Sequence, residues 1–289
     1  MKTKKIYFPV VMALIATNGF AKEIKIGKYF ELYSTLGVMN YTYESATSTS
    51  KDNKITDNIP LAGIGGAASI FYDNFGFLGI NGRYETTGGG QDNLGNTLVK
   101  LERQDWSTAL FYKPSTNISI LKDLSFSAGY QNGRTNLDHI SDLEGRGVNS
   151  HFTAKGPFIG LIYGHTFGVS QTNKNGYGKL NISIAAAKLD GEESVYNPVS
   201  TFEKIGMGDT LAGKLSLSWS GVFLPKTIKS KSTDPAVAYK ISLDAYRYDF
   251  NVDKMVEKRN GIIVNPSATG NFGLTETVFS IKFQLSYLF

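Results

Sequence analysis

The sequence contains no cysteine among its 289 residues. This absence excludes disulfide bonds, zinc sites with thiolate ligands and cysteine-bound iron–sulfur clusters. Only three histidines are present, His139, His151 and His165, and they are too few and too scattered to indicate a metal site. We therefore expect no cofactor, and the sequence assigns no metal-binding or cofactor-binding residue.

Long apolar runs are also missing from most of the chain. A helix needs roughly 20 consecutive apolar residues to cross a bilayer, and no stretch after residue 21 reaches that length. Proline is scarce, whereas the chain has 31 glycines and 12% aromatic residues. This combination is typical of a transmembrane β-barrel, in which only alternate residues face lipid.

The first 21 residues have the three parts of a secretory signal peptide. Three lysines lie within the first five residues, residues 6–16 form a short apolar run, and Gly19 and Ala21 are small residues before the expected cut. The run is too short for a membrane span, so an uncleaved anchor is the less favoured alternative. We expect residues 1–21 to be removed after secretion through the inner membrane, leaving 22–289 as one barrel domain.

Little excess charge remains once this segment is removed. The mature chain loses three lysines and no acidic residue, so its net charge falls from +5 to +2. It shows no basic stripe, and we therefore expect no nucleic-acid partner.

The end of the chain alternates strictly between apolar and mostly polar residues. Every second residue from Phe279 to Phe289 is apolar, whereas Ser280, Lys282 and Gln284 lie between them. A period of two indicates a β-strand with different surroundings on its two faces. The apolar face suits lipid and the polar face suits a barrel interior.

The same pattern recurs along the chain. It is clear in residues 124–130, 180–186, 211–223 and 237–245, and weaker in 29–45, 60–72, 75–87, 97–112 and 152–167. In the segment 29–45 both faces carry apolar residues, so its facing is uncertain. With the final strand the count is ten, which predicts an all-β, antiparallel, up-and-down transmembrane barrel of about ten strands. Three expected periplasmic turns are long, so eight or twelve strands remain alternatives.

The polar segments between these strands predict long external loops. They are residues 45–58, 88–96, 134–150, 190–208 and 251–271. Aromatic residues near the expected strand ends suggest girdles at the two membrane interfaces. Tyr41, Tyr43, Tyr84, Tyr246 and Tyr248 are assigned to the outer girdle, and Tyr72, Phe75, Tyr112, Phe223 and Phe289 to the periplasmic one.

The signal peptide together with the aromatic end of the chain resembles bacterial outer-membrane β-barrel proteins. The resemblance depends on Ile281, Phe283, Leu285, Tyr287 and Phe289. It implies that the barrel-assembly machinery reads this terminal strand, and that the protein resides in the outer membrane of a Gram-negative cell. Outer-membrane lipid and lipopolysaccharide are the other implied partners. No specific family is identified.

The charged residues on the predicted inner face are the candidate functional residues. They are Arg83, Glu85, Arg103, Asp105, Lys214, Lys240, Asp244 and Lys282. One interpretation is a plug of ion pairs, because an unpaired buried charge costs several kcal/mol. The other is a narrow path that prefers anions.

These observations favour an outer-membrane barrel of structural or passive role, with a narrow pore as one form of it, and no enzymatic activity. The first alternative is surface binding or adhesion through the external loops. Lys254, Lys258 and Arg259 in the loop 251–271 suit lipopolysaccharide phosphates. The second alternative is an outer-membrane hydrolase, for which the segment 135–151 holds the one concentration of acidic residues and histidines. No catalytic residue is assigned.

Overall fold

The structure is a computed structural model that describes residues 26–47, 50–72, 75–94, 97–118, 121–141, 149–168, 177–196, 201–222, 236–254, 257–259, 262–265 and 273–288. The expected signal peptide and Phe289 lie outside these ranges. Among the residues described, no helix is long and apolar enough to cross a membrane.

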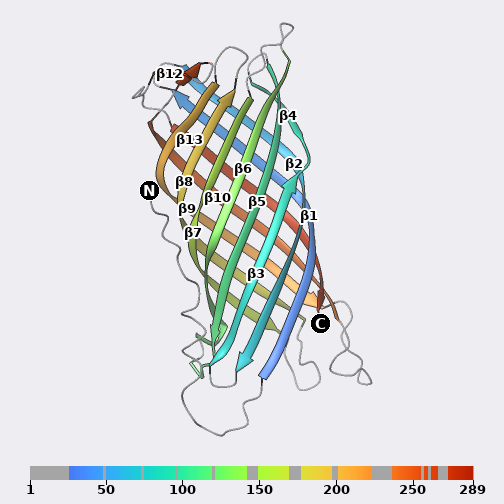
Figure 1. The fold of residues 1–289 in the computed structure, drawn as a ribbon. Helices are drawn as coiled ribbons and strands as arrows, with labels where there is room; N and C mark the ends of the chain where they lie inside the picture. The colour runs from blue at the N-terminus through green and yellow to red at the C-terminus, as the bar shows by residue number, and fades with distance from the viewer. Residues whose placement is uncertain are drawn as a thin grey trace.

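Ten long strands form the wall of the molecule (Figure 1). They are β1 (Ile26–Thr47), β2 (Ser50–Tyr72), β3 (Gly76–Thr87), β5 (Thr97–Pro114), β6 (Leu124–Ser141), β7 (Asn149–Phe167), β8 (Gly178–Tyr196), β9 (Thr201–Val222), β10 (Ala236–Lys254) and β13 (Gly273–Leu288). Each strand pairs antiparallel with its neighbours in chain order, and β13 pairs with β1 to close the ring. The prediction of a closed ten-stranded barrel is confirmed.

Closure satisfies the main requirement of a sheet in lipid. The hydrocarbon offers no hydrogen-bonding partner, so an open edge would leave a row of N–H and C=O groups unpaired. Here the register between β1 and β13 runs without a break from Glu31 opposite Leu288 to Ala46 opposite Gly273. The terminal strand therefore completes the barrel by pairing with the first.

Three short strands and one short 3-10 helix accompany the wall. Strand β4 (Gly90–Leu94) pairs with β5, and β11 (Glu257–Arg259) pairs with both β9 and β12 (Ile262–Asn265). The helix η2 spans Leu121–Asp123. We call the end where β1 begins and β13 finishes the terminal end; the other, where β4 and β12 lie, is the far end (Figure 1).

The wall extends further than expected at the far end. The prediction of a loop over residues 45–58 is wrong, because β1 and β2 occupy all of it except residues 48 and 49. The predicted loops 88–96, 134–150, 190–208 and 251–271 are likewise partly strand. These segments look polar because their outward residues are polar, yet Ile55 in the first and Leu137 in the third are buried inside the barrel.

Strand β10 keeps the same residues facing inward along its length, but the polarity of its two faces exchanges partway. On β10, Ile241 and Leu243 point outward and are exposed, while Asp244 is buried inside. Beyond Ala245 the outward positions carry charge, as at Arg247, and the inward position 248 carries a buried tyrosine. The barrel therefore has an apolar outside near the terminal end and a polar outside near the far end.

Strand β1 shows the same exchange and explains its ambiguous sequence. Leu36 and Val38 are exposed on the outer face, whereas Met39, Tyr41 and Tyr43 are buried in the interior. Both faces are apolar, but at different heights. On β1, the outward residues are apolar in the part near the terminal end, and the inward residues are apolar in the part near the far end. The sequence looked ambiguous because it combines these two parts.

The assignment of an outer aromatic girdle is largely wrong. Tyr41, Tyr43, Tyr246 and Tyr248 are buried inside the barrel, and only Tyr84 is exposed on the outer surface. The physical reason is the exchange of polarity. Near the far end the outer face is polar, so the apolar residues, including these tyrosines, point inward and pack in the interior. Of the periplasmic set, Phe75 is exposed, Tyr72 and Tyr112 are half-buried, and Phe223 and Phe289 lie outside the described residues.

We predict that an arginine on the outer face is costly only within the apolar band. Phe283→Arg should reduce the free energy of unfolding in lipid vesicles by about 2–4 kcal/mol, because position 283 lies in the middle of the band. The matched control is Thr277→Arg, on the same face of the same strand beyond the band, for which about 0–1 kcal/mol is expected. Urea titration would measure both, and equal costs would contradict the assignment of the band.

Candidate functional site

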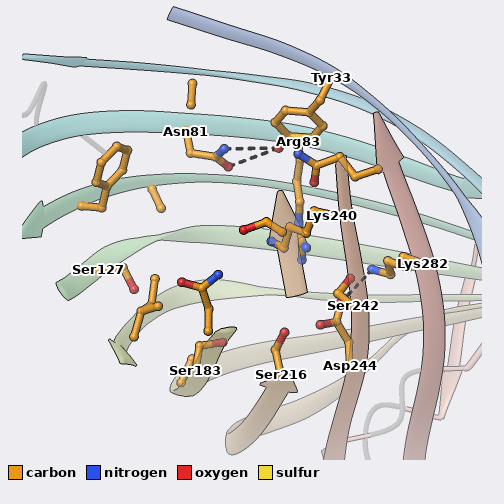
Figure 2. A pocket seen from close by; sticks show the side chains of 18 of the residues that line it. Tyr33, Asn81, Arg83, Ser127, Ser183, Ser216, Lys240, Ser242, Asp244 and Lys282 are labelled. Carbon is orange, nitrogen blue, oxygen red and sulfur yellow. Dashed lines mark hydrogen bonds and ion pairs between the residues drawn. The ribbon is translucent and has the colours of Figure 1, made fainter. Parts of the chain in front are cut away.

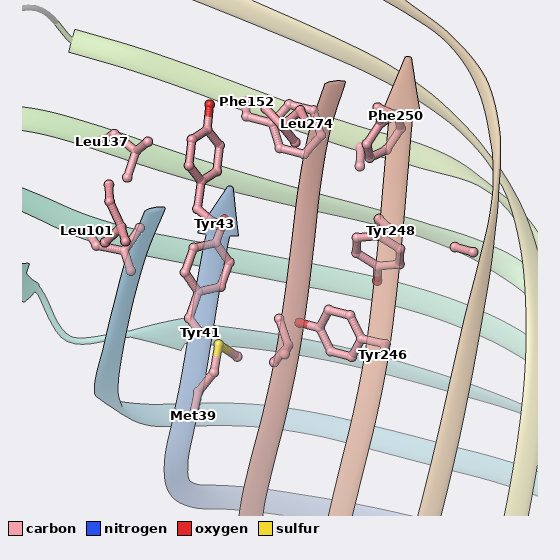
Figure 3. Close-up of a cluster of buried hydrophobic side chains, with 14 of the residues drawn as sticks. Met39, Tyr41, Tyr43, Leu101, Leu137, Phe152, Tyr246, Tyr248, Phe250 and Leu274 are labelled. Atoms are coloured by element: carbon pink, nitrogen blue, oxygen red, sulfur yellow. The ribbon is translucent and has the colours of Figure 1, made fainter. Parts of the chain in front are cut away.

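The barrel interior is filled at the far end by a cluster of buried apolar side chains, which we call the plug (Figure 3). Its members come from every strand of the wall except β3. They are Met39, Tyr41, Tyr43, Ile55, Ile59, Leu61, Val99, Leu101, Leu137, Phe152, Ala154, Ala187, Leu189, Ala212, Tyr246, Tyr248, Phe250, Leu274 and Val278. This half of the barrel is packed like the core of a soluble protein.

Aromatic side chains make the largest contribution to the plug. The rings of Phe152 and Phe250 lie edge to face with their centroids 5.1 Å apart, and those of Tyr246 and Tyr248 are 5.0 Å apart. Aromatic residues each bury roughly 150–250 Å² and prefer such geometries. Three of these rings are on β10, and Phe152 reaches Phe250 from β7, although β8 and β9 separate the two strands in the wall, so this contact crosses part of the space that an open channel would need.

A buried ion-pair cluster centred on Arg103 lies against the plug. The Arg103 side chain is 1% exposed, and its Nη1 donates to Glu276 Oε2 at 2.8 Å and to Thr135 Oγ1 at 3.0 Å. Its Nε and Nη2 donate to the two carboxylate oxygens of Asp105 at 2.8 and 2.9 Å. The Tyr41 hydroxyl also donates to Glu276. All charges in this cluster are paired.

Towards the terminal end the interior carries a second network of ion pairs. Lys282 Nζ lies 2.7 Å from Glu85 Oε2 and 3.1 Å from Asp244 Oδ2. Lys214 Nζ lies 3.6 Å from the same Asp244 oxygen. Arg83 donates from Nε to Ser107 Oγ at 3.0 Å and approaches Glu85 at 4.0 Å. Five strands, β3, β5, β9, β10 and β13, are thus joined through their inward side chains.

Beside this network lies a cavity of about 940 Å³, which we call the chamber (Figure 2). Its wall extends from residues at the terminal end, such as Gly178 and Val222, to plug residues such as Ala187 and Ala212. Figure 2 shows Arg83 and Lys240 close together, with Lys282 beside Asp244. The plug therefore closes the chamber on the far side.

The structure places the predicted interior residues in two groups. Arg83, Glu85, Lys214, Lys240, Asp244 and Lys282 line the chamber, whereas Arg103 and Asp105 belong to the cluster against the plug. Seven of the eight take part in ion pairs with one another or with Glu276; the exception within the described chain is Lys240.

Sequence analysis missed two buried acidic residues of the interior. Glu276 is fully buried and has the same facing as Lys282 on β13, so the alternation would have found it. Glu193 is buried at the far end, where it accepts hydrogen bonds from Tyr43 and Ser150. Burial raises the pKa of Glu193, and these two hydrogen bonds oppose the shift.

The segment considered for hydrolysis does not bring its nucleophile and base together. Ser150 points into the interior and bonds Glu193, whereas His151 points outward, 3.9 Å from Asp138 and 3.4 Å from Arg134. Neighbouring residues of a strand face opposite sides, so Ser150 and His151 cannot form a pair. Residues 142–148 and the side chain of His139 lie outside the described residues.

Four of the five residues of the expected assembly signal lie on the outer face of β13, and the fifth, Phe289, lies outside the described residues. Ile281, Phe283, Leu285 and Tyr287 are between 42% and 62% exposed, as lipid-facing residues would be. The side chains of Lys254, Lys258 and Arg259, and those of residues 197–209, lie outside the described residues.

Solved structures provide the comparison with known proteins. The outer membrane protease OmpT from Escherichia coli aligns over 95% of this chain and 99% of its own, with 14% identity and a TM-score of 0.55. The β domain of the Bordetella autotransporter BrkA aligns over 91% and 98%, with 10% identity and a TM-score of 0.40. The Pseudomonas putida toluene transporter TodX aligns over 91% and 90%, with 11% identity and a TM-score of 0.29.

The likeness to OmpT, together with the closed ring, defines the class of the fold. The chain has the fold of a bacterial outer-membrane β-barrel. No protein-family model matches the sequence, and no curated protein matches it either. At 14% identity the likeness to OmpT shows the fold alone.

We predict that the Arg103 cluster is important for stability. Glu276→Gln removes one of the two carboxylates that pair with Arg103 and weakens its charged hydrogen bonds, which should cost about 1.5–3 kcal/mol, because Asp105 still neutralises the guanidinium. The control is Glu44→Gln, which breaks the exposed pair of Glu44 with Lys54 and should cost about 0–1 kcal/mol. Urea unfolding of both variants measures the difference, and a cost for Glu276→Gln no larger than the control would contradict the prediction.

Proposed function

We propose that this protein is an outer-membrane β-barrel closed to the passage of solutes, with a structural role as a rigid membrane-embedded platform. The observation that carries this proposal is the plug. Its buried aromatic rings and the Arg103 cluster fill the far half of the interior. A path through the barrel would require these packed side chains to separate, at the cost of breaking buried ion pairs and exposing apolar area to water.

The proposed placement has the terminal end in the periplasm and the far end outside the cell. The far end has polar outward residues such as Lys54, Glu102 and Arg247, which suit water, and it stands beyond the apolar band. The band itself suits the acyl chains of the membrane. Secretion through the inner membrane by the signal peptide remains part of the proposal.

The proposed partners follow from the outer surface. Arg134, Lys155 and Lys188 lie on neighbouring strands just beyond the apolar band, where lipopolysaccharide phosphates would lie in an outer leaflet. The barrel-assembly machinery is the proposed reader of the terminal strand, since the residues of that strand expose a regular apolar face.

We expect the purified protein to be silent in a planar lipid bilayer. Even at high protein load it should give no stepwise conductance, because the plug leaves no continuous water path. Reconstituted vesicles in which folding and insertion have been verified by gel mobility and protease protection serve as the control. Discrete conductance steps that scale with the inserted protein would instead establish a pore.

A further inference from the structure

The charges on the wall of the chamber do not balance. Eight charged side chains line it: Glu31, Arg83, Glu85, Lys179, Lys214, Lys240, Asp244 and Lys282. Five are basic and three are acidic. Glu85 and Asp244 are already shared among Arg83, Lys214 and Lys282, and Glu31 accepts hydrogen bonds from Tyr29 and Gln284.

Two lysines remain without a neutralising partner. Across the described part of the chain, the ammonium groups of Lys179 and Lys240 make no hydrogen bond or ion pair with another side chain. Asp123, whose charge acts on Lys179, is already bonded to His165 at 2.9 Å, and Lys113 adds a further positive charge there. Lys240 experiences the positive charges of Arg83 and Lys282 as well as the attraction of Asp244 and Glu31.

The register of the barrel brings these two lysines to one place. Lys179 on β8 and Lys240 on β10 both pair with Ser220 on the intervening strand β9. They therefore lie at the same level on either side of one strand, roughly 10 Å apart at their Cα atoms, given about 4.8 Å between adjacent strands. Both line the chamber, as does Ser220. In the structure the Lys179 ammonium lies over Gly164 of β7, and a change of side-chain rotamer would let both lysines reach one point in front of β9.

An anion is the natural complement of this arrangement. Two cations in a confined cavity repel each other and lose part of their hydration, and both effects are relieved when a negative group lies between them. Ammonium groups bind carboxylate and phosphate oxygens through charge-assisted hydrogen bonds. The chamber volume of about 940 Å³ is within the usual range of small-molecule pockets, about 300–1,000 Å³.

The rest of the wall indicates what the anion would be attached to. Ser127 and Ser183 line the chamber, and neither hydroxyl is bonded to another described residue. Tyr33 and Asn81, which bond each other, lie on the opposite part of the wall in Figure 2. Such groups can exchange hydrogen bonds with the hydroxyls of a ligand.

We propose that the chamber is a binding site for a small oxyanion, a carboxylate or phosphate on a hydroxyl-rich body, held between Lys179 and Lys240. This binding site goes beyond the proposed structural role, because a purely structural barrel needs no ligand. The ligand would enter the chamber from the terminal end and leave by the same route. Closure of the barrel and binding in the chamber are separate properties, so conductance tests the first and equilibrium binding tests the second.

The test is calorimetric titration of the full-length protein, folded in detergent, with glucose 6-phosphate, gluconate, inorganic phosphate and neutral glucose. The three anions should bind saturably and glucose should not, with inorganic phosphate the weakest of the three because it lacks the hydroxyl-rich body. Lys179→Gln and Lys240→Gln should each weaken anion binding about tenfold, since each removes one charge-assisted hydrogen bond. The double variant should lose saturable binding.

The matched control is Lys54→Gln, on the outward face of β2 at the far end, where Lys54 is exposed. It should leave the affinity unchanged while altering the net charge by the same amount. Equal weakening by Lys54→Gln and Lys240→Gln would overturn the proposal in favour of general electrostatic attraction. The absence of saturable binding of any anion to the folded wild-type protein would overturn it outright, whatever the conductance experiment shows.

Discussion

Everything in this barrel depends on strands that pass from lipid into water without changing which residues face inward. Where the outside meets lipid, outward side chains are apolar and the interior can be polar. Where the outside meets water, the same wall must behave as a soluble β-structure, with polar residues outward and an apolar core inside. Leu243 and Arg247 on the outer face of β10, opposed by Asp244 and Tyr248 on its inner face, show both regimes within six residues.

This single constraint accounts for the division of the interior. The plug forms at the level where water surrounds the wall, because its aromatic rings have no other apolar surroundings. The ion-pair network around Lys282 and the chamber lie at the level of the apolar band, where a polar interior is possible. Arg103 lies at the transition, and its fully buried guanidinium is tolerated because Glu276 and Asp105 both neutralise it and take up its hydrogen-bond donors.

Much of this architecture could be predicted from alternation alone, including the closed ring and its ten strands. The facing of Lys240, Asp244 and Lys282 follows from the same rule. The plug was missed because tyrosines near strand ends were assigned to a lipid interface, although Tyr246 and Tyr248 continue the inward facing of Asp244. The pairing of Arg103 with Glu276, and of Lys179 with Lys240 across Ser220, could not be predicted, because each depends on the register of several strands around the ring.

The exchange of polarity can be measured directly on β10, because the chain has no cysteine and any introduced thiol is unique. Single cysteines at Leu243, Arg247 and Phe250 would be exposed, in vesicles, to a water-soluble maleimide and, in a separate experiment, to a lipid-restricted quencher of a fluorophore attached at the same position. We expect position 243 to be quenched from lipid, position 247 to react rapidly from water, and the buried position 250 to be protected from both. Rapid reaction at position 250, or quenching from lipid at position 247, would contradict the exchange of polarity.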